Sequence, residues 1–574
     1  MTPAKNNWYS VWRINMRNRT LGREPVPESW EHLGGRGLLA RVLLDEIDPL
    51  CEPLGPNNKL VFAPGLLVGH MLSSGDRISI GAKSPLTNGI KESNAGGRTG
   101  MQLARLGIKA LIIEERPEEP GLWILHLSSN GARFEPIGDL AGLGVFEVAP
   151  PLLERYGDKV AIALIGPGGE MRLASAGIQN LDKDRVPSRI AARGGLGAVM
   201  ASQGLKAIVI DGIDGENPPL ANPEGFKQAQ KEYTQALLAH PQIKVYTDYG
   251  TAAMVRMSNG FGGIPTKNFS TGQFEGAEKI SGEVMREMML ERDGECQTAH
   301  ACMAGCTIQS SNIFGNKNGE AVVSPLEYET IGLLGSNLGI DDLDTIALMN
   351  WEISDLGLDT IEVGAALGVA AEAGLMEFGD GERAMQLIHE IRAGTPLGRV
   401  LGQGALTTGK VFGVEHIPVA KGQAMSAYDP RAIKGTGVTY ATSPQGADHT
   451  CGLTIRAKVD HLDPKPQAEI SRNSQISMAG YDSIGACIFS GFGYGVVPHT
   501  IPALIRARYG WDVPEDFLQQ LGRETLKLER EFNRRAGFTE ADDRLPEWFS
   551  NTPISPHDAV FDVDAEDLDN VFNW

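Results

Sequence analysis

The sequence predicts an α+β protein in which a β-rich first domain is followed by two mainly α-helical domains. Up to about residue 211 the apolar runs are short and are separated by Gly, Pro and Asn, a pattern typical of strands. From Asn222 onward the apolar residues recur at helical spacing. Glycine accounts for 70 of the 574 residues and gathers in short polar loops, which indicates main chain that closely approaches ligands.

Six apolar runs are the predicted strands of the first domain. They are KLVFAP at 59–64, RISIG at 77–81, IKALIIEE at 108–115, LWILHL at 122–127, VAIALIG at 160–166 and LKAIVI at 205–210. Turn-forming residues lie on both sides of each run, as expected for strands of one compact unit.

Capping residues predict the starts of several helices in the second part of the chain. Asn222 precedes Pro and Glu and then FKQAQKEYTQALLAH, a helix with a favourable first turn. Asp341 opens DDLDTIALMNWEISDLG, and Asp359 opens another helix with Glu362 placed three residues later, as in a capping box. A further helix is expected over 514–535.

Breaks in this pattern near residues 212 and 420 predict three domains. The first, 1–211, is expected to bind the main ligands. The second, 212–420, contains a cysteine cluster and Glu327. The third, 421–574, contains His449, Asp482 and Cys487.

Composition excludes several classes of function. The formal net charge of −20 argues against a nucleic-acid partner, because binding many phosphates requires a basic surface. No run approaches the ~18 consecutive apolar residues of a membrane span, and the opening MTPAKNNWYSVWRINMRN has no apolar core of a signal peptide. Six cysteines in so long a chain are too few for a disulfide framework. We therefore expect a cytoplasmic protein without membrane insertion.

Glycine-rich loops form two sets. GGRGLL at 34–39, NAGGR at 94–98 and RGGLGAV at 193–199 combine small residues with Arg, which suits phosphate groups. SDLGLD at 354–359 and DSIGAC at 482–487 each place a carboxylate beside a Gly turn, which suits the amino and ring N–H groups of a heterocycle such as a pterin. Taken singly, each loop is also compatible with an ordinary turn. Their pairing predicts a doubled cofactor.

The cysteines predict a metal centre. Cys296, Cys302 and Cys306 lie within eleven residues in CQTAHACMAGC, and Cys487 closes the second Asp–Gly turn. Four thiolates are the usual ligands of an iron–sulfur cluster. A zinc site that includes His300, or buried cysteines without metal, are the alternatives.

Eight segments in the same order resemble the aldehyde ferredoxin oxidoreductase family. They are GGRGLLARVLL, FAPGLLVG, AKSPLTNGIKESNAGGRTG, RGGLGAVMASQGLKAIVI, PLEYET, DLGLDTI, YATSPQGADH and DSIGACIF. The resemblance extends from the N-terminus to at least residue 490. It implies a β-rich domain that holds two molybdopterins, whose sulfurs bind tungsten or molybdenum, beneath two helical domains.

The resemblance also implies roles for individual residues. The positions that match the phosphate side are Arg77, Asn94, Gly96, Ala191, Arg193, Gly194 and Gly195. Asn94 and the carbonyl of Ala191 match the groups that bind a bridging Mg²⁺, a cation that prefers oxygen ligands. The positions that match the pterin-binding turns are Gly357, Asp359, Asp482 and Gly485. Ser354 stands where the family has Asp, and neighbouring Asp355 is expected to replace it.

The implied [4Fe-4S] cluster meets one departure from the family pattern. The family's CxxCxxxC motif is incomplete here, because Ala299 stands where the first Cys would be. Cys296 is expected to reach the cluster through a bulged loop, together with Cys302, Cys306 and Cys487, and His300 is a substitute.

The implied reaction is oxidation of a small aldehyde to a carboxylic acid. His449, Glu327 and Glu329 are the expected proton-transfer residues, since burial moves a carboxyl pKa towards neutral. A solvated helix start for Glu327 and an ordinary polar role for His449 are the alternatives. Electrons are expected to leave through the cluster to a ferredoxin or ferredoxin-like iron–sulfur subunit, and a homo- or hetero-oligomer is compatible with this.

Two other functions remain open at this stage. The family includes a ring-reducing catalytic subunit of benzoyl-CoA reductase, and a chain of this fold can also act as a non-catalytic scaffold or electron-carrying subunit. The sequence does not choose tungsten over molybdenum, because the cofactor's own sulfurs bind either metal.

Overall fold

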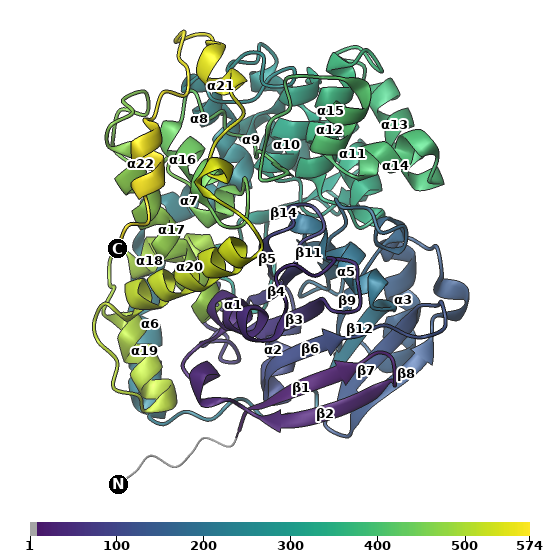
Figure 1. Ribbon diagram of the computed structural model, residues 1–574, viewed down its shortest axis with the longest axis vertical. Helices are drawn as coiled ribbons and strands as arrows, with labels where there is room; N and C mark the ends of the chain where they lie inside the picture. Colours follow the sequence, from purple (N-terminus) through teal and green to yellow (C-terminus); the bar gives the residue numbers. More distant parts are fainter. Residues whose placement is uncertain (1–7) are drawn as a thin grey trace.

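The computed structural model describes residues 8–574 and starts with two six-stranded mixed sheets, seen in the lower and central part of Figure 1. The first sheet contains β1 (Ser10–Asn15), β2 (Thr20–Pro25), β3 (Lys59–Pro64), β4 (Ile78–Lys83), β5 (Ile90–Ala95) and β6 (Ile108–Glu114). The second contains β7 (Trp123–Ser128), β8 (Gly131–Pro136), β9 (Ala161–Leu164), β10 (Ile178–Asn180), β11 (Arg189–Ala191) and β12 (Leu205–Asp211).

The second sheet repeats the topology of the first. The strand order is β2-β1-β6-β3-β4-β5 in one and β8-β7-β12-β9-β10-β11 in the other. In each sheet the first and last strands in sequence, β1 with β6 and β7 with β12, run parallel. Corresponding helices are α1 (Gly35–Glu46) and α3 (Val145–Tyr156), and then α2 (Thr99–Arg105) and α5 (Leu196–Ser202), with short α4 (Pro167–Glu170) in the second unit alone. Residues 10–211 are therefore two copies of one supersecondary unit.

The two sheets pack face to face. Side chains such as Leu60 and Ile80 from the first sheet share one core with Leu125 and Ile208 from the second. Helix α1 covers the outer face of the first sheet, and α3 covers that of the second. Each sheet is thus buried on both faces, which explains its continuous apolar runs.

All six predicted strands are present, and their limits differ from the prediction by at most about two residues. Strand β5 was not predicted, because its sequence IKESNA is polar. It is nevertheless buried, and its Lys91 is paired with Asp448 at 2.7 Å. Buried ion pairs of this kind conceal a strand from a pattern based on hydropathy.

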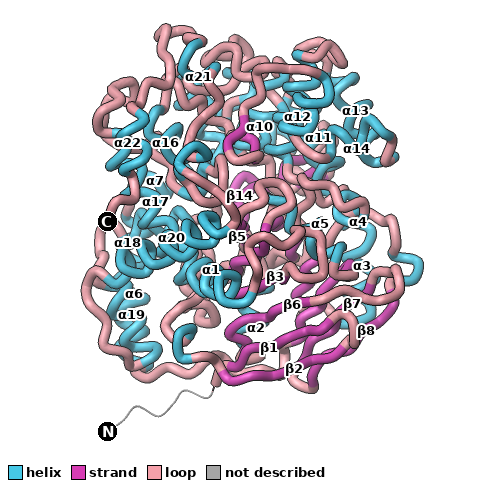
Figure 2. The backbone as a smooth tube through the Cα atoms, in the orientation of Figure 1, coloured by secondary structure: helices cyan, strands magenta, loops and turns pink. Residues whose placement is uncertain are grey.

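The remainder is mainly helical, as the cyan segments of the backbone tube in Figure 2 show. Residues 223–412 form α6 (Pro223–Ala239), α7 (Pro241–Tyr249), α8 (Met254–Gly260), α9 (Gly282–Arg292), α10 (Tyr328–Leu334), α11 (Leu343–Asp355), α12 (Thr360–Glu372), α13 (Gly381–Ala393), α14 (Pro396–Gly402) and α15 (Ala405–Phe412). Residues 434–570 form α16 (Lys434–Thr442), α17 (Gln467–Ile484), α18 (Gly491–Tyr494), α19 (Thr500–Tyr509), α20 (Phe517–Arg535), α21 (Trp548–Asn551) and α22 (Ala565–Asn570). The predicted α+β class is confirmed.

The helical part also contains small sheets. The cysteine segment lies in a three-stranded sheet of β13 (Gln297–His300), β14 (Ser311–Gly315) and β15 (Ala321–Val323). A two-stranded ribbon joins β16 (Val419–Ala420) to β17 (Gln423–Ala424), at the expected boundary near residue 420. Helix α6 packs on α18 and α19 from the far end of the chain, so the helical regions interleave.

Two predicted helix caps, Asn222 and Asp359, are present, and α11 is capped by Asp342 in place of the predicted Asp341. Asn222 accepts from the N–H of Gly225, and Asp359 accepts from the N–H of Ile361, both at 3.0 Å. Helix α20 lies within the predicted range 514–535. Glu362, however, does not close the expected capping box, because its carboxylate accepts from the N–H groups of Ala405 and Ala424 instead.

Within residues 8–574, no helix has both the length and the apolar character that crossing a bilayer requires.

Candidate active site

A cavity of about 380 Å³ lies between the two-sheet unit and the helices. The predicted site residues that line it are Arg77, Gly96, Cys302, Glu327, Glu329, Asp359, His449 and Cys487. The strand ends of the first domain and several helices all contribute to its wall. The cavity therefore brings together residues that are up to 410 positions apart in the chain.

The two β units hold the two Asp–Gly turns in the same way. The N–H of Arg77 donates to the carbonyl of Gly485 at 3.1 Å, and the N–H of Gly177 donates to the carbonyl of Gly357 at 2.9 Å. Gly485 and Gly357 both have positive φ, at 84° and 70°. The predicted pairing of turns thus corresponds to the duplication of the sheet unit.

The first β unit contacts the turn at 482–487 so closely that only glycine fits at two of its positions. A Cβ added to Gly65 would lie 2.1 Å from the main-chain nitrogen of Gly485. A Cβ on Gly35 would lie 2.1 Å from the carbonyl oxygen of Asp482. Glycines of the GGRGLL loop therefore pack against a turn, and they are not free to surround a phosphate.

Arg36 of that loop pairs with carboxylates. Its guanidinium donates to Glu529 at 2.7 and 2.9 Å and to Asp482 at 3.3 Å. Burial and the neighbouring Glu92 raise the pKa of Asp482 well above its usual range, against the effect of Arg36. The phosphate role predicted for this arginine is replaced by a structural one, and Asp482 is left as a buried carboxyl group.

Arg193 behaves similarly at the other turn. Its guanidinium donates to Asp359 at 3.2 Å and to the carbonyls of Ala424 and Ala447, both at 2.6 Å. The guanidinium of Arg193 is thus held by protein groups, and its implied position on the phosphate side of a cofactor stays a prediction. Gly194 and Gly195, which follow it, have φ of 83° and 76°, where a side chain would be strained. An added Cβ would lie 2.3 Å from the side chain of Lys91 at Gly194 and 2.6 Å from that of Pro85 at Gly195, so both glycines allow close packing.

Asp355 does not replace a carboxylate at position 354. Its side chain accepts from the N–H of Phe146 at 3.1 Å, near the start of α3, and from Arg392 at 2.9 Å. Neighbouring Ser354 does line the cavity, whereas Asp355 does not. The expectation for Asp355 is corrected, because adjacent residues at a helix end point in different directions.

Asn94 and Ala191 lie where the two sheets meet. They belong to the edge strands β5 and β11, which are neighbours in space. Arg77 donates to the side-chain oxygen of Asn94 and, at 3.3 Å, to its carbonyl. A Cβ on Gly96 would lie 3.3 Å from the sulfur of Cys302, so a glycine at this position leaves room for the thiol.

Three of the four predicted cluster thiols come together. Interaction between the thiols of Cys302 and Cys306 lowers the pKa of Cys306 to about 5 and raises that of Cys302. Cys487 is close enough for Cys306 to influence its pKa, which burial raises. The N–H of Cys487 donates to the carbonyl of Ser74 at 2.8 Å, and the hydroxyl of Ser74 lies 3.6 Å from the sulfur of Cys306.

Cys296 does not join this group. It precedes β13, and its sulfur packs beside Gly315 at the far end of β14. Four residues of extended chain separate it from His300, which corresponds to about 13 Å. The pairing of β13 with β14 does shift register between Gln297 and His300, as an expected bulge would, but Cys296 stays beside Gly315. His300 is hydrogen-bonded to Asp184 at 2.7 Å and to Arg189 at 3.5 Å.

The three predicted proton-transfer residues lie together. Nε2 of His449 is 3.2 Å from Glu329, and its Nδ1 is 2.8 Å from the hydroxyl of Ser426. Glu327 accepts a hydrogen bond from Thr251. Burial, with a smaller contribution from Glu329, raises the pKa of Glu327.

The sequence did not single out several residues of the cavity wall. Gln179 and Arg189 come from β10 and β11 of the second unit, and each has a buried polar atom without a partner among the described residues. Tyr246, Tyr428 and Phe489 add an aromatic surface. In the sequence these two residues appear only as polar residues in short strands, and this feature is too common to identify them as site residues.

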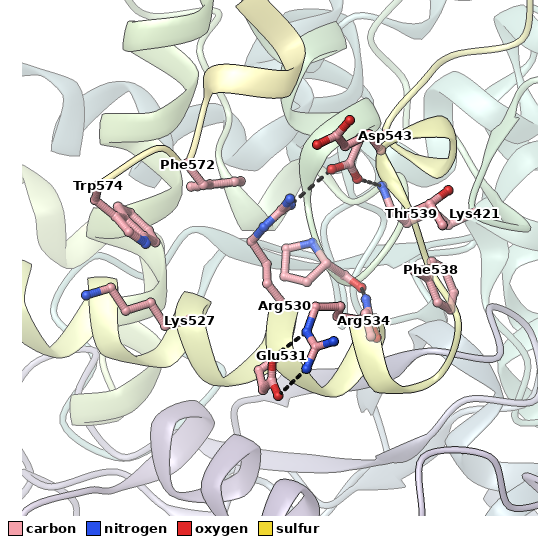
Figure 3. Close-up of a pocket in the computed structure, with 13 residues that line it drawn as sticks. Lys421, Lys527, Arg530, Glu531, Arg534, Phe538, Thr539, Asp543, Phe572 and Trp574 are labelled. Carbon is pink, nitrogen blue, oxygen red and sulfur yellow. Dashed lines mark hydrogen bonds and ion pairs between the residues drawn. The ribbon is translucent and has the colours of Figure 1, made fainter.

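A second cavity of about 570 Å³ lies beside α20 (Figure 3). Charged side chains surround it, with Asp543 bonded to Arg530 and Lys421, and Glu531 bonded to Arg534. It shares no described lining residue with the first cavity and contains no predicted site residue.

Comparison with known proteins agrees with the resemblance seen in the sequence. The family described as "Aldehyde ferredoxin oxidoreductase, N-terminal domain" matches residues 11–212, and "Aldehyde ferredoxin oxidoreductase, domains 2 & 3" matches residues 228–571. The tungsten-containing aldehyde ferredoxin oxidoreductase of Pyrococcus horikoshii is 33% identical over 95% of this chain and 92% of its own length. The enzyme of the same name from Thermococcus kodakarensis is 32% identical, with 96% and 92% covered.

Two further similarities are more distant. The WOR-like subunit of the aliphatic sulfonate oxidoreductase of Pyrococcus furiosus is 26% identical over 87% of this chain and 81% of its own length. The active-site complex BamBC of benzoyl coenzyme A reductase, solved with 1,5-dienoyl-CoA, superposes with a TM-score of 0.79 at 19% identity. That alignment covers 94% of this chain and 91% of the solved one, and it supports the fold.

The two matches to the family together span nearly the whole chain, and the similarity to the Pyrococcus horikoshii enzyme covers most of both proteins. The chain therefore belongs to the aldehyde ferredoxin oxidoreductase family, a family of oxidoreductases.

Proposed function

We propose that this chain oxidises small aldehydes to carboxylic acids at a tungsten- or molybdenum-bis-pterin site. The tungsten-containing relatives favour tungsten. The observation that carries the proposal is the shared cavity, in which Glu327, Glu329 and His449 lie on the same walls as the thiols of Cys302 and Cys487. Oxidation of an aldehyde by water releases both protons and electrons, and this cavity has groups suited to each.

The residues around the cavity fit two pterins. Asp482 and Glu92 are buried carboxyl groups whose pKa values are raised, chiefly by burial, and such groups gain from donors such as ring N–H. Arg189 Nε is a buried donor without a partner among residues 8–574. We propose that the turns at 354–359 and 482–487 hold the pterin rings.

The phosphate side of the cofactor is assigned to the junction of the two sheets. Gly96 and the loop at 191–195 offer main chain there, with Arg77 beside Asn94. The side-chain oxygen of Asn94 and the carbonyl of Ala191 are the proposed Mg²⁺ ligands, since this cation prefers oxygen. Because Arg77 already donates to Asn94, one lone pair of that oxygen remains for the cation.

When bound, the metal and its pterins supply the electron-accepting centre, and the chain supplies the proton chemistry. Ser426 fixes the ring of His449 by its bond to Nδ1, so that Nε2 faces Glu329. We assign to this pair the removal of a proton from the water that adds to the aldehyde carbon. The rings of Tyr246, Tyr428 and Phe489 give the cavity wall an apolar surface.

Glu327 is assigned as the second proton acceptor. Thr251 orients its carboxyl group, and burial raises its pKa, so that it can hold a proton at a higher pH than an exposed glutamate. Glu327 lines the same cavity as Glu329, and the two carboxyl groups are near enough that Glu329 contributes to raising the pKa of Glu327.

Electrons are proposed to leave through a [4Fe-4S] cluster on Cys302, Cys306 and Cys487. The position of Cys296 leaves the fourth iron to a ligand other than this thiol. A ferredoxin or ferredoxin-like subunit is the proposed acceptor, and the naming of one relative as a subunit supports an oligomeric partner. We propose a cytoplasmic location, where reducing conditions keep cysteine thiols available as metal ligands.

Metal analysis followed by an activity assay tests this proposal. Stoichiometric tungsten or molybdenum, about four iron atoms per chain and aldehyde-dependent reduction of a dye are expected. Protein that carries both metals but reduces an aromatic thioester in place of oxidising aldehydes would favour the ring-reducing alternative. Protein that takes up neither metal under tungstate, molybdate and iron supplementation would favour the scaffold alternative.

A further inference from the structure

The duplicated unit allows the two turns to be compared position by position. Arg77 and Gly177 make the same main-chain bond, to Gly485 and Gly357. The turns therefore align so that Asp482 corresponds to Ser354, three residues before each glycine. One half of the site has a buried carboxyl group where the other has a hydroxyl.

Neither residue of the Ser354–Asp355 pair replaces that carboxyl group. The hydroxyl of Ser354 donates to the side chain of Asn350 at 3.2 Å. The carboxylate of Asp355 is bound by Phe146 N–H and Arg392. Asp359 on the same turn also lines the cavity, but its carboxylate already accepts from Arg193 and from the N–H of Ile361. A further hydrogen-bond acceptor for this half of the site would come from another element.

Gln179 on β10 lies at this place. Its Nε2 donates to the carbonyl of Ser354 at 3.2 Å. A carbonyl can only accept, so the amide nitrogen must face Ser354, and the amide oxygen must point elsewhere. That oxygen is buried, has no partner among the described residues 8–574, and belongs to a side chain that lines the cavity.

The first unit shows the reciprocal arrangement. Ile78 pairs with Ala95 and Ile178 pairs with Ala191, so Ser79 occupies the position that corresponds to Gln179. In the first unit the strand has the short side chain of Ser79 and the turn has the carboxyl group of Asp482. In the second unit the strand has the longer side chain of Gln179 and the turn has the hydroxyl group of Ser354. Each half of the site would then have one acceptor oxygen of this kind, from the turn in the first half and from the strand in the second.

We propose that the side-chain oxygen of Gln179 accepts the amino and ring N–H groups of one pterin, in the half of the site where Ser354 offers no carboxylate. The ligand class follows from the site, since an uncharged oxygen held in fixed orientation suits a neutral donor edge. This inference rests on the proposed function, because it requires two pterins.

The test measures how long purified enzyme retains its cofactor. Metal per chain and released pterin, oxidised to its fluorescent form, are followed during incubation at raised temperature. Gln179→Leu is expected to lose both on the order of tenfold faster than wild type, through loss of one hydrogen bond. Gln179→Glu keeps an oxygen at this position and is expected to retain the cofactor better than Gln179→Leu. Adding Ser354→Asp to the Gln179→Leu enzyme is expected to restore its retention of metal and pterin.

Gln203→Leu is the matched control. Gln203 is also buried, its Nε2 binds the carbonyls of Asn58 and Ile113, and its oxygen also lacks a partner among the described residues, but it does not line the cavity. Equal loss in this control and in Gln179→Leu, or no loss in Gln179→Leu, would overturn the inference. Wild-type enzyme without pterin would instead overturn the proposed function itself.

Discussion

Three buried cations near the cavity are each paired with a carboxylate. Arg36, Arg193 and Lys91 have fully or nearly buried side chains, and each lies within 3.3 Å of a carboxylate. If such a cation lost its carboxylate partner, a buried charge would be left without compensation, which destabilises the fold by several kcal/mol. The arginines of the glycine loops therefore hold the turns in place, and the sequence, which shows only the residue types, had indicated phosphate.

Glu327→Gln tests the proposed proton acceptor. The turnover number for aldehyde oxidation is expected to fall by about 10²–10⁴-fold, the usual contribution of a positioned acid or base. In wild type the rate should rise with pH as Glu327 ionises, and this rise lies above the range of an ordinary glutamate because burial raises the pKa. Gln cannot ionise, so this limb of the pH–rate profile should disappear.

Glu320→Gln serves as the control for that substitution. Glu320 is an exposed residue of the β14–β15 hairpin and does not line the cavity. Its rate and pH profile should match wild type. A Glu327→Gln enzyme that keeps the wild-type limb would exclude Glu327 as the titrating group.

Lys91→Met tests the buried ion pair with Asp448. Burial disfavours ionised Asp448, but Lys91, Arg193 and His449 together hold its pKa well below the usual range. Removal of Lys91 is expected to cost about 3 kcal/mol, seen as a lower midpoint of thermal unfolding at pH 7.

The pH dependence of this loss has a definite sign. Because the pKa of Asp448 is lower in the folded state, its contribution is present above the unfolded value of about 3.9 and is lost as pH falls below it. The difference between wild type and Lys91→Met should therefore shrink in acid. A difference that grows below pH 4 would contradict the assignment.

At the scale of elements, the duplicated unit explains why the active site has paired turns. Each copy presents one main-chain N–H, from Arg77 or Gly177, to one turn of the helical part. Both turns come at the end of a long helix, α17 or α11. The contact is main chain on main chain, so it depends on glycine and on the register of β4 and β10.

Gly65→Ala tests this contact. The added methyl group would lie 2.1 Å from the main-chain nitrogen of Gly485, and a backbone neighbour cannot rotate away. We expect about 1–3 kcal/mol of destabilisation and faster loss of bound metal. Gly121→Ala, at a site with nothing within 4 Å, should leave the unfolding midpoint and metal content unchanged. Equal midpoints in both variants would disprove the tight contact.

At the scale of the whole molecule, the site exists only after distant segments have packed. The thiols of Cys302 and Cys306 lie on the loop after β13, whereas Cys487 follows α17. A cluster bound by all three would join these segments, and a ligand that binds only the folded state raises stability. The packing of α6 against α18 and α19 is a second contact between the middle and the C-terminal part of the chain.

Cys487→Ser tests the cluster at this scale. Iron per chain should fall to near zero, and the midpoint of thermal unfolding should fall by at least a few degrees, because the link between the segments is lost. Cys296→Ser should keep both the iron and the midpoint. The reverse pattern, with iron lost only in Cys296→Ser, would require the β13 segment to rearrange when the cluster binds.

Local patterns in the sequence were enough to predict much of the fold. The apolar runs gave six strands, the capping residues Asn222 and Asp359 gave helix starts, and the order of glycine and cysteine motifs gave the family. These features depend on neighbours in the chain, through side-chain period, turn chemistry and caps. The cavity residues Glu327, Glu329 and His449 were also predicted, through the resemblance.

Other features were decided by tertiary structure alone. Asp355 rather than Ser354 binds the start of α3, Cys296 packs beside Gly315, and the side-chain oxygen of Gln179 is buried without a partner among the described residues. Each outcome depends on which strand or helix lies opposite, and a shift of one residue reverses the direction of a side chain. The sequence by itself therefore determined the elements and the family, and long-range packing determined which polar atoms face the cofactor cavity.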